Sequence, residues 1–190
     1  MTRFDPVSPD VDHPILNPIF DRFRDADREP PELYRILGIA PAMLRAWVDM
    51  AWPLRMDATS SRALRELMIM RVAVLTNASF EWEAHWPAAT SAGVRVAQLA
   101  ALNDWATSEE FSPTERIALR IVDEMIIDGS ASAAAVTELR SEFSDGECIE
   151  LILTSSYYSC VSHTLLSLGI GAGSQPFDDE RHEIFARLTD

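Results

Sequence analysis

Two segments of the sequence, Leu67–Leu75 and Leu151–Leu168, are apolar nearly all round at helical spacing, and they constrain the fold more than any other feature. Helices of this character lie inside a bundle or at an oligomer interface, because they have no polar face to turn toward solvent. The β-branched alternation that is typical of strands is missing. The sequence therefore predicts an all-α domain with a core of packed helices. So much apolar surface in 190 residues also predicts self-association.

Start and stop signals divide the chain into a bundle of about seven to eight helices. Ser112, Pro113 and Glu115 have the positions of a helix cap, a first-turn proline and the acidic member of a capping box. Glycines at positions 93, 129 and 169 are expected to end helices. The predicted helices span residues 42–56, 61–75, 79–92, 94–103, 113–127, 132–143, 146–168 and 178–188.

The beginning of the chain differs from the rest. The first 31 residues hold six of the eleven prolines and show neither a helical nor a strand period. Residues 1–31 therefore read as an extended arm that wraps a neighbour or lies across its own domain. Residues 32–190 read as a single helical domain.

The charge of the chain excludes several functions. All 16 basic residues are arginine, against 30 acidic residues, so the net charge is −14. Without lysine, the chain can form neither a Schiff base nor a P-loop. An acidic surface repels phosphate backbones and anionic lipid, so nucleic acid and membranes are poor partners. A small molecule or another protein is the expected ligand, and the lack of an apolar leader after Met1 predicts a cytoplasmic location.

Sequence signatures of metal and cofactor sites are missing. The ligand spacings of zinc and di-iron sites do not occur. The glycine-rich stretch 169–174 follows a predicted helix rather than a strand and ends in serine, so it does not match a dinucleotide-binding loop. Cys148 and Cys160 are twelve residues apart, about 18 Å along one helix, which is too far for a disulfide. We therefore expect no metal and no cofactor.

A glutamate and a histidine form the first candidate for acid/base chemistry. Glu81 and His85 are four residues apart and share one helical face, within hydrogen-bonding reach. Such a pair can relay protons, and Phe80, Trp82 and Trp86 could keep water away from it. Spacing alone favours the simpler interpretation, a structural Glu–His pair near a helix start, because such pairs are common.

Glu66 and His163 are the next candidates. Glu66 lies on an apolar stripe with Arg62 as its only ionic neighbour on that face, so it is either buried with a shifted pKa or paired with arginine and structural. The structural pairing is favoured. His163 has Ser159 and Ser167 one turn before and after it on an apolar helix. A core histidine bound to serine or backbone is favoured there, with a pocket-lining role as the alternative.

The segments 62–73, 77–85 and 92–94, with helices at 112–116 and 150–170, resemble the carboxymuconolactone decarboxylase and alkylhydroperoxidase-D (AhpD-like) superfamily. The resemblance covers about residues 32–172. It implies an all-α AhpD-like fold that assembles as a dimer, trimer or hexamer, with a site between helices near subunit contacts.

The resemblance also implies which activity is missing. The peroxidase branch has a Cys-x-x-Cys-x-x-x-His motif with a glutamate twelve residues before the first cysteine. Aligned on His85, the cysteines fall on Ala78 and Glu81, and the distant glutamate on Glu66. Thiol peroxidase activity is therefore not expected, because both sulfurs are replaced and Cys148 and Cys160 lie on another helix.

The remaining residues resemble the branch without thiols. In that branch, chemistry without a cofactor proceeds by acid/base and electrostatic stabilisation of an enolate-like intermediate. The resemblance implies His85, Glu81 and Glu66 as catalytic residues. The candidates for substrate binding are Arg71, for a carboxylate, together with Phe80, Trp82 and His163.

Two functions of different classes follow. One is a lyase or isomerase acting on a small carboxylated or lactone-like molecule, with His85 as general acid or base. The other is a non-catalytic oligomeric scaffold or binding protein, and residual peroxidase-related activity is a weaker third. Glu66 separates the first two: a buried carboxylate that faces His85 across a cavity favours catalysis, whereas a tight pair with Arg62 or Arg71 and no cavity favours the scaffold.

Overall fold

The computed structural model describes residues 2–171 and 179–189. Within these residues the chain forms ten α-helices, one short 3-10 helix and no strand, so the prediction of an all-α domain is confirmed. The elements in chain order are α1 (Asn17–Arg24), α2 (Glu32–Leu37), α3 (Pro41–Met56), α4 (Arg62–Leu75), α5 (Ser79–Ala92), α6 (Val96–Ala100), η1 (Leu102–Asp104), α7 (Pro113–Ile127), α8 (Ala133–Glu142), α9 (Asp145–Leu168) and α10 (Glu180–Thr189).

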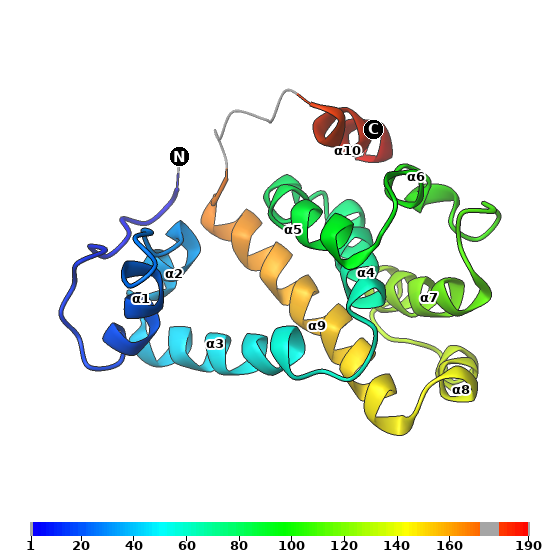
Figure 1. The fold of residues 1–190 in the computed structure, drawn as a ribbon, viewed down its shortest axis with the longest axis horizontal. Coiled ribbons are helices and arrows are strands. Elements are labelled where there is room, and N and C mark those ends of the chain that lie inside the picture. Colours follow the sequence, from blue (N-terminus) through cyan, green and yellow to red (C-terminus); the bar gives the residue numbers. More distant parts are fainter. Residues whose placement is uncertain (1, 172–178, 190) are drawn as a thin grey trace.

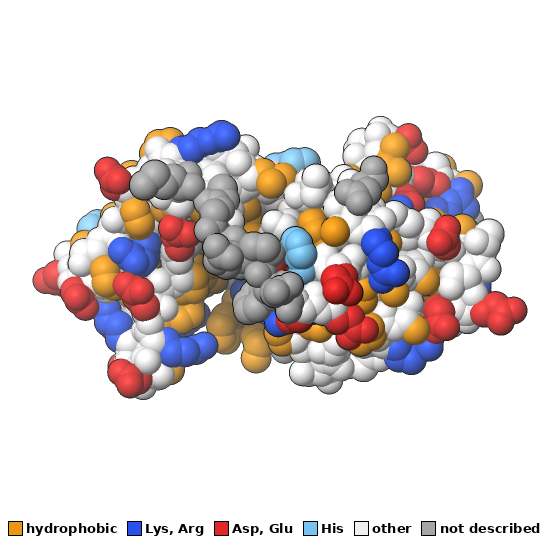
Figure 2. Space-filling view, turned by 90° about the horizontal axis from the view of Figure 1, so that it is seen from above, with side chains coloured by type: hydrophobic (Ala, Val, Ile, Leu, Met, Phe, Trp, Pro, Cys, Tyr) orange, Lys and Arg blue, Asp and Glu red, His pale blue; other side chains and the backbone are white. Residues whose placement is uncertain are grey.

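Helix α4 is the centre of the bundle. It packs against α5, α7 and α9, while α10 covers α4, α5 and α6. Every residue from Leu64 to Val74 is buried, as expected for a segment that is apolar nearly all round. The first three helices lie together at one side, where α3 reaches across to the long helix α9 (Figure 1). Seen from above, apolar side chains line the indentation between this side and the rest of the molecule (Figure 2).

The second apolar segment, in α9, is buried on one face only. Leu151, Tyr158 and Leu165 point into the core, whereas Ile149, Leu153 and Leu166 remain exposed. Within the described residues, no helix combines the length and the apolar character needed to cross a membrane.

Most helix limits agree with the prediction, because capping signals are local. Ser112 and Glu115 form the predicted capping box of α7, and left-handed Gly93 and Gly169 end α5 and α9. The predicted helix 94–103 is wrong as one element, because the chain breaks at Ala101 into α6 and η1. Residues 172–178, which include part of the glycine-rich stretch and the predicted start of the last helix, lie outside the described residues.

The prediction of an extended arm is wrong for residues 17–24, which form α1. Pro18 lies in the first turn, where a missing N–H costs no hydrogen bond. Ile19 and Phe20 are buried against Leu44 and Val48 of α3. Residues 2–31 therefore pack on their own domain, and their apolar residues, rather than the prolines, decide the local structure.

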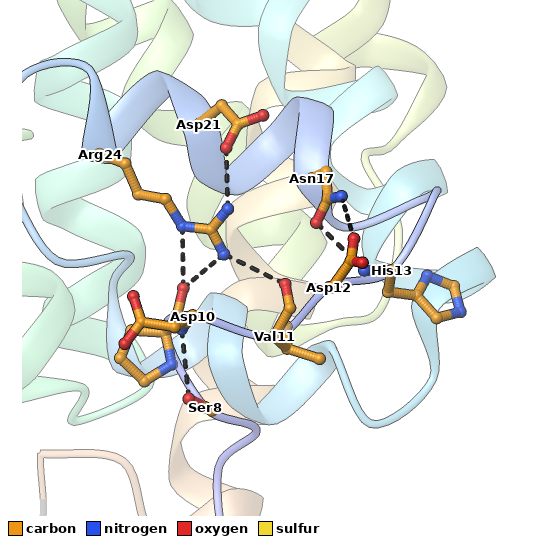
Figure 3. A network of polar contacts seen from close by, with 9 residues as sticks. Ser8, Asp10, Val11, Asp12, His13, Asn17, Asp21 and Arg24 are labelled. Atoms are coloured by element: carbon orange, nitrogen blue, oxygen red, sulfur yellow. Dashed lines mark hydrogen bonds and ion pairs between the residues drawn. The ribbon is translucent and has the colours of Figure 1, made fainter.

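Polar contacts hold the segment before α1 in place (Figure 3). The Arg24 guanidinium donates to the carbonyls of Pro9 and Val11 and pairs with Asp21 at 2.8 Å. Asn17 accepts a hydrogen bond from the His13 backbone N–H at 3.1 Å. These contacts close a loop between residues 9 and 24 and satisfy its backbone carbonyls.

Replacing Arg24 tests this network. We expect Arg24→Ala to lower the free energy of unfolding by about 1–2 kcal/mol, because two carbonyl acceptors lose a charged donor. Urea unfolding measures the change, and Arg140→Ala is the control, because its pair with Asp145 is exposed. An Arg24→Ala curve that overlays the wild-type curve would contradict the prediction.

Candidate functional site

Three titratable side chains from two helices meet in the core of the bundle. Glu66 lies on α4, and Glu81 and His85 lie one turn apart on α5, which packs beside it. The exposed fraction is 0% for Glu66, 4% for Glu81 and 8% for His85. Buried ionisable groups are rare unless they are paired, so their grouping marks this cluster as the candidate site.

The His85 imidazole bridges the two carboxylates. Its Nδ1 lies 2.7 Å from Glu66 Oε2, and its Nε2 lies 3.1 Å from Glu81 Oε1. The i,i+4 contact between Glu81 and His85 was predicted from spacing, and the structure confirms it. The contact with Glu66 joins residues 19 positions apart, and only the family resemblance had linked them.

A partly exposed arginine helps to balance the negative charge of the cluster. Arg62, one turn before Glu66 on α4, forms an ion pair with Glu66 Oε1 and is itself partly exposed. An unpaired carboxylate at this depth would be strongly destabilising. Glu66 thus meets His85 in direct contact rather than across a cavity, and it is tightly paired with Arg62; of the two arrangements expected to separate catalysis from scaffolding, this is the one expected of a scaffold.

The two carboxylates make His85 a stronger base. Burial lowers its pKa, but hydrogen bonding to Glu66 and Glu81 outweighs burial and raises the pKa to about 9. At neutral pH the ring therefore carries a proton on each nitrogen and donates toward both glutamates. His85 is thus a proton donor at neutral pH, and it becomes an acceptor once one carboxylate takes up its proton.

Tyr158 closes the cluster from α9 and was missed by sequence reasoning. Its ring meets the His85 ring edge to face, with centroids 4.9 Å apart, and it is 1% exposed. Burial raises the pKa of its phenol, which accepts a hydrogen bond from Arg55 Nε at 3.2 Å. Helical spacing could have revealed it, because Leu151, Ser155 and Tyr158 share the buried face of α9.

Two predicted substrate-binding residues are occupied elsewhere. Arg71 pairs with both carboxylate oxygens of Asp123, at 2.7 and 2.9 Å, and donates to Asn103 at 2.8 Å. The structure therefore does not bring its guanidinium to the cluster. Trp82 is fully buried in a separate hydrophobic cluster, where it packs against Trp86 and Phe185.

Phe80, on α5, and His163, on α9, lie near the carboxyl-terminal end of α9. Phe80 lines a cavity of about 220 Å³ together with Ala78 and Gly171. His163 is exposed, so the favoured prediction of a core histidine is wrong: it lies on the solvent face of α9, with Ser159 Oγ 3.5 Å from Nδ1.

The structure also bears on metal and thiol chemistry. Within residues 2–171 and 179–189, no group of three or more His, Cys, Asp or Glu side chains is arranged to hold a metal ion. Cys148 is buried and Cys160 is exposed, and both are free thiols. The position that aligns with the first family cysteine is Ala78, which is buried just before α5.

Comparison with known proteins shows a family pattern in part of the chain. The carboxymuconolactone decarboxylase family pattern matches residues 41–124, which span α3 to α7 and hold Glu66, Glu81 and His85. Residues 41–124 therefore resemble this family, and the fold of the chain is AhpD-like. No curated protein sequence matches this carboxymuconolactone decarboxylase-like chain.

Three solved structures share this AhpD-like fold. An uncharacterized peroxidase-related protein with an AhpD core from Ralstonia eutropha JMP134 has a TM-score of 0.74 and 14% identity, covering 100% of this chain and 97% of that chain. A debrominase in complex with 2,3,4-tribromopyrrole has a TM-score of 0.74 and 15% identity, covering 100% of both chains. An uncharacterized peroxidase-related protein from Silicibacter has a TM-score of 0.70 and 16% identity, covering 97% and 99%. These identities show the fold alone.

The raised pKa of His85 makes stability depend on pH. Because the folded value of about 9 exceeds the unfolded value of about 6.5, this contribution is complete below pH 6.5 and disappears as the pH rises through 9. We expect unfolding free energy to fall by about 3 kcal/mol across that window. Urea unfolding at several pH values measures it, with His163→Gln as the control at an exposed histidine. A wild-type profile that stays flat to pH 9 would contradict the prediction.

Replacing one of the two carboxylates should lower the pKa of His85. We expect Glu81→Gln to move the His85 pKa from about 9 toward about 6.5, because one of its two charged acceptors becomes neutral. An NMR titration of the imidazole resonances gives the value directly. Glu83→Gln, two residues along α5, is the matched control and should leave the titration unchanged. Identical titrations in all three proteins would show that Glu81 does not act on His85.

Proposed function

We propose that this carboxymuconolactone decarboxylase-like chain is a cofactor-independent acid/base enzyme, a lyase or isomerase acting on a small carboxylated or lactone-like molecule. The observation that carries the proposal is the His85 imidazole held between Glu66 and Glu81 at 2.7 and 3.1 Å, inside a helical core. Proton transfer through positioned groups contributes about 10²–10⁴-fold to a rate.

Each residue of the cluster has a distinct role in this proposal. A glutamate removes the proton from a carbon next to a carbonyl, which leaves an enolate. The His85 imidazolium donates a proton to the oxygen of this enolate or to the other carbon of its double-bond system. The number of protons in the cluster is then unchanged, so no external acid is needed. Glu81 orients the ring, Glu66 is the second proton carrier, and Arg62 pairs with Glu66.

Thiol peroxidase chemistry is not part of the proposal. The residues that align with the two family cysteines are Ala78 and Glu81, so a disulfide cannot form there. The peroxidase-related and debrominase descriptions belong to neighbours of 14–16% identity. They share a scaffold with this chain, and its acid/base residues favour a different reaction.

The alternative is a non-catalytic scaffold or binding protein of the same fold. The ion pair between Arg62 and Glu66 favours it, because a carboxylate fixed by arginine can be purely structural. In that case the cluster would hold α4 against α5 without moving protons.

The proposal includes a setting for the site. We place the protein in the cytoplasm as a homo-oligomer, a dimer, trimer or hexamer, with residues 1–31 as an N-terminal segment that packs on the domain of residues 32–190. Met50, Pro53 and Leu153 line an open apolar depression between α3 and α9 that a second copy could cover. Because the net charge of −14 repels phosphate backbones, nucleic acid is not an expected partner.

Kinetics on a panel of small lactones and carboxylates test the enzyme function, with solvent-deuterium incorporation next to the carbonyl as a second readout. We expect His85→Gln and Glu81→Gln to lower kcat/KM by about 10²–10⁴-fold. Glu83→Gln is the control on the same helix and should retain the wild-type rate. If the folded wild type neither converts any compound of the panel nor exchanges its protons for deuterium, the enzyme function is rejected in favour of the scaffold function.

A further inference from the structure

A cavity of about 370 Å³ lies among α1, α2 and α3, and the proposed acid/base chemistry does not use it. Its volume is within the range of small-molecule sites, about 300–1,000 Å³. Apolar side chains form part of the wall, including Ile19, Val48 and Ala51. The rest of the wall consists of three aromatic and three arginine side chains: Phe23, Tyr34, Trp52, Arg22, Arg28 and Arg55.

The arginines of this cavity lack acidic partners. Among the described residues, no carboxylate pairs with Arg22, Arg28 or Arg55, although the chain carries 30 acidic residues. Arg22 stacks on the Trp52 ring at 4.9 Å, and Arg28 on the Phe23 ring at 5.7 Å. Stacking holds the guanidinium planes while leaving their N–H groups available to an anion.

The cavity is joined to the acid/base cluster through one side chain. Arg55 lines the cavity and donates from Nε to the Tyr158 hydroxyl at 3.2 Å, and the Tyr158 ring packs on His85. A second connection runs through the backbone, because Arg62 donates to the Arg55 carbonyl at 2.8 Å and pairs with Glu66. A negative charge placed beside Arg55 would therefore act on the surroundings of His85.

We propose that this cavity is a binding site for a small carboxylate with a flat apolar body, and that its occupancy is transmitted to His85 through Arg55 and Tyr158. Guanidinium groups bind carboxylates through paired N–H groups, and aromatic walls suit a planar ring. Binding itself is independent of the proposed enzyme function. Only the transmission step rests on it.

Benzoate is the probe, with benzamide as its neutral counterpart. The fluorescence of Trp52 reports binding, and Trp52→Phe identifies that signal among the five tryptophans. We expect saturable binding of benzoate to the full-length protein below about 10 mM, and binding of benzamide about tenfold weaker or more. No saturation by benzoate, or equal affinity for benzamide, would overturn the proposal.

Single arginine variants locate the site. We expect Arg28→Gln and Arg22→Gln to weaken benzoate binding by about tenfold each, because each removes a charged donor. Both side chains are exposed, so the variants should fold. Arg45→Gln is the control, since Arg45 is an exposed arginine of α3 outside the cavity. If Arg45→Gln weakens binding as much as Arg28→Gln, the attraction is nonspecific and the proposal is wrong.

Two further variants separate binding from transmission. We expect benzoate to shift the His85 imidazole resonances in the wild type, and Tyr158→Phe to reduce that shift while benzoate still binds, because the connection through the hydroxyl is lost and only the one through the Arg55 carbonyl remains. An unchanged shift in Tyr158→Phe would overturn the transmission step. His85→Gln should bind benzoate with wild-type affinity whether or not the acid/base function holds, so failure of one idea is distinguishable from failure of the other.

Discussion

The structure depends on how the charge of Glu66 is neutralised in the core. This carboxylate lies on α4, the helix that packs against α5, α7 and α9, and none of its surface reaches solvent. Arg62 and His85 balance it, one from the same helix and one from α5. Leaving such a charge without a partner costs about 3–5 kcal/mol, so the register of α5 on α4 is fixed electrostatically as well as by apolar packing.

Local patterns in the sequence predicted most helices from α3 onward and the contacts within a helix, but not α1 or α2. The α7 capping box and the Glu81–His85 pair both arise from residues three or four positions apart, so sequence reasoning reached them. The region around α1 was misread because its prolines concealed the apolar residues that bury it against α3. The composition of a segment limits which secondary structures it can adopt, whereas the residues that it buries decide which of them it forms.

Contacts between distant helices lay beyond sequence reasoning. Helical spacing places Tyr158 on the buried face of α9 but does not indicate its contact with His85, because 73 positions separate them and only the packing of α9 and α5 on α4 brings them together. Arg71 shows the reverse case: its place in the motif suggested a substrate carboxylate, but Asp123 of α7, 52 residues away, binds its guanidinium. Which carboxylate an arginine meets depends on tertiary structure.

The connection between Arg62 and the Arg55 carbonyl has a mechanical consequence. It joins the last turn of α3 to the first turn of α4 by a side-chain hydrogen bond. A ligand that pulls Arg55 toward the cavity also draws on the cation that neutralises Glu66. The turn between α3 and α4 therefore links an arginine that lines the cavity to the arginine that pairs with buried Glu66, and the rigidity of this turn sets how strongly the cavity and the cluster are coupled.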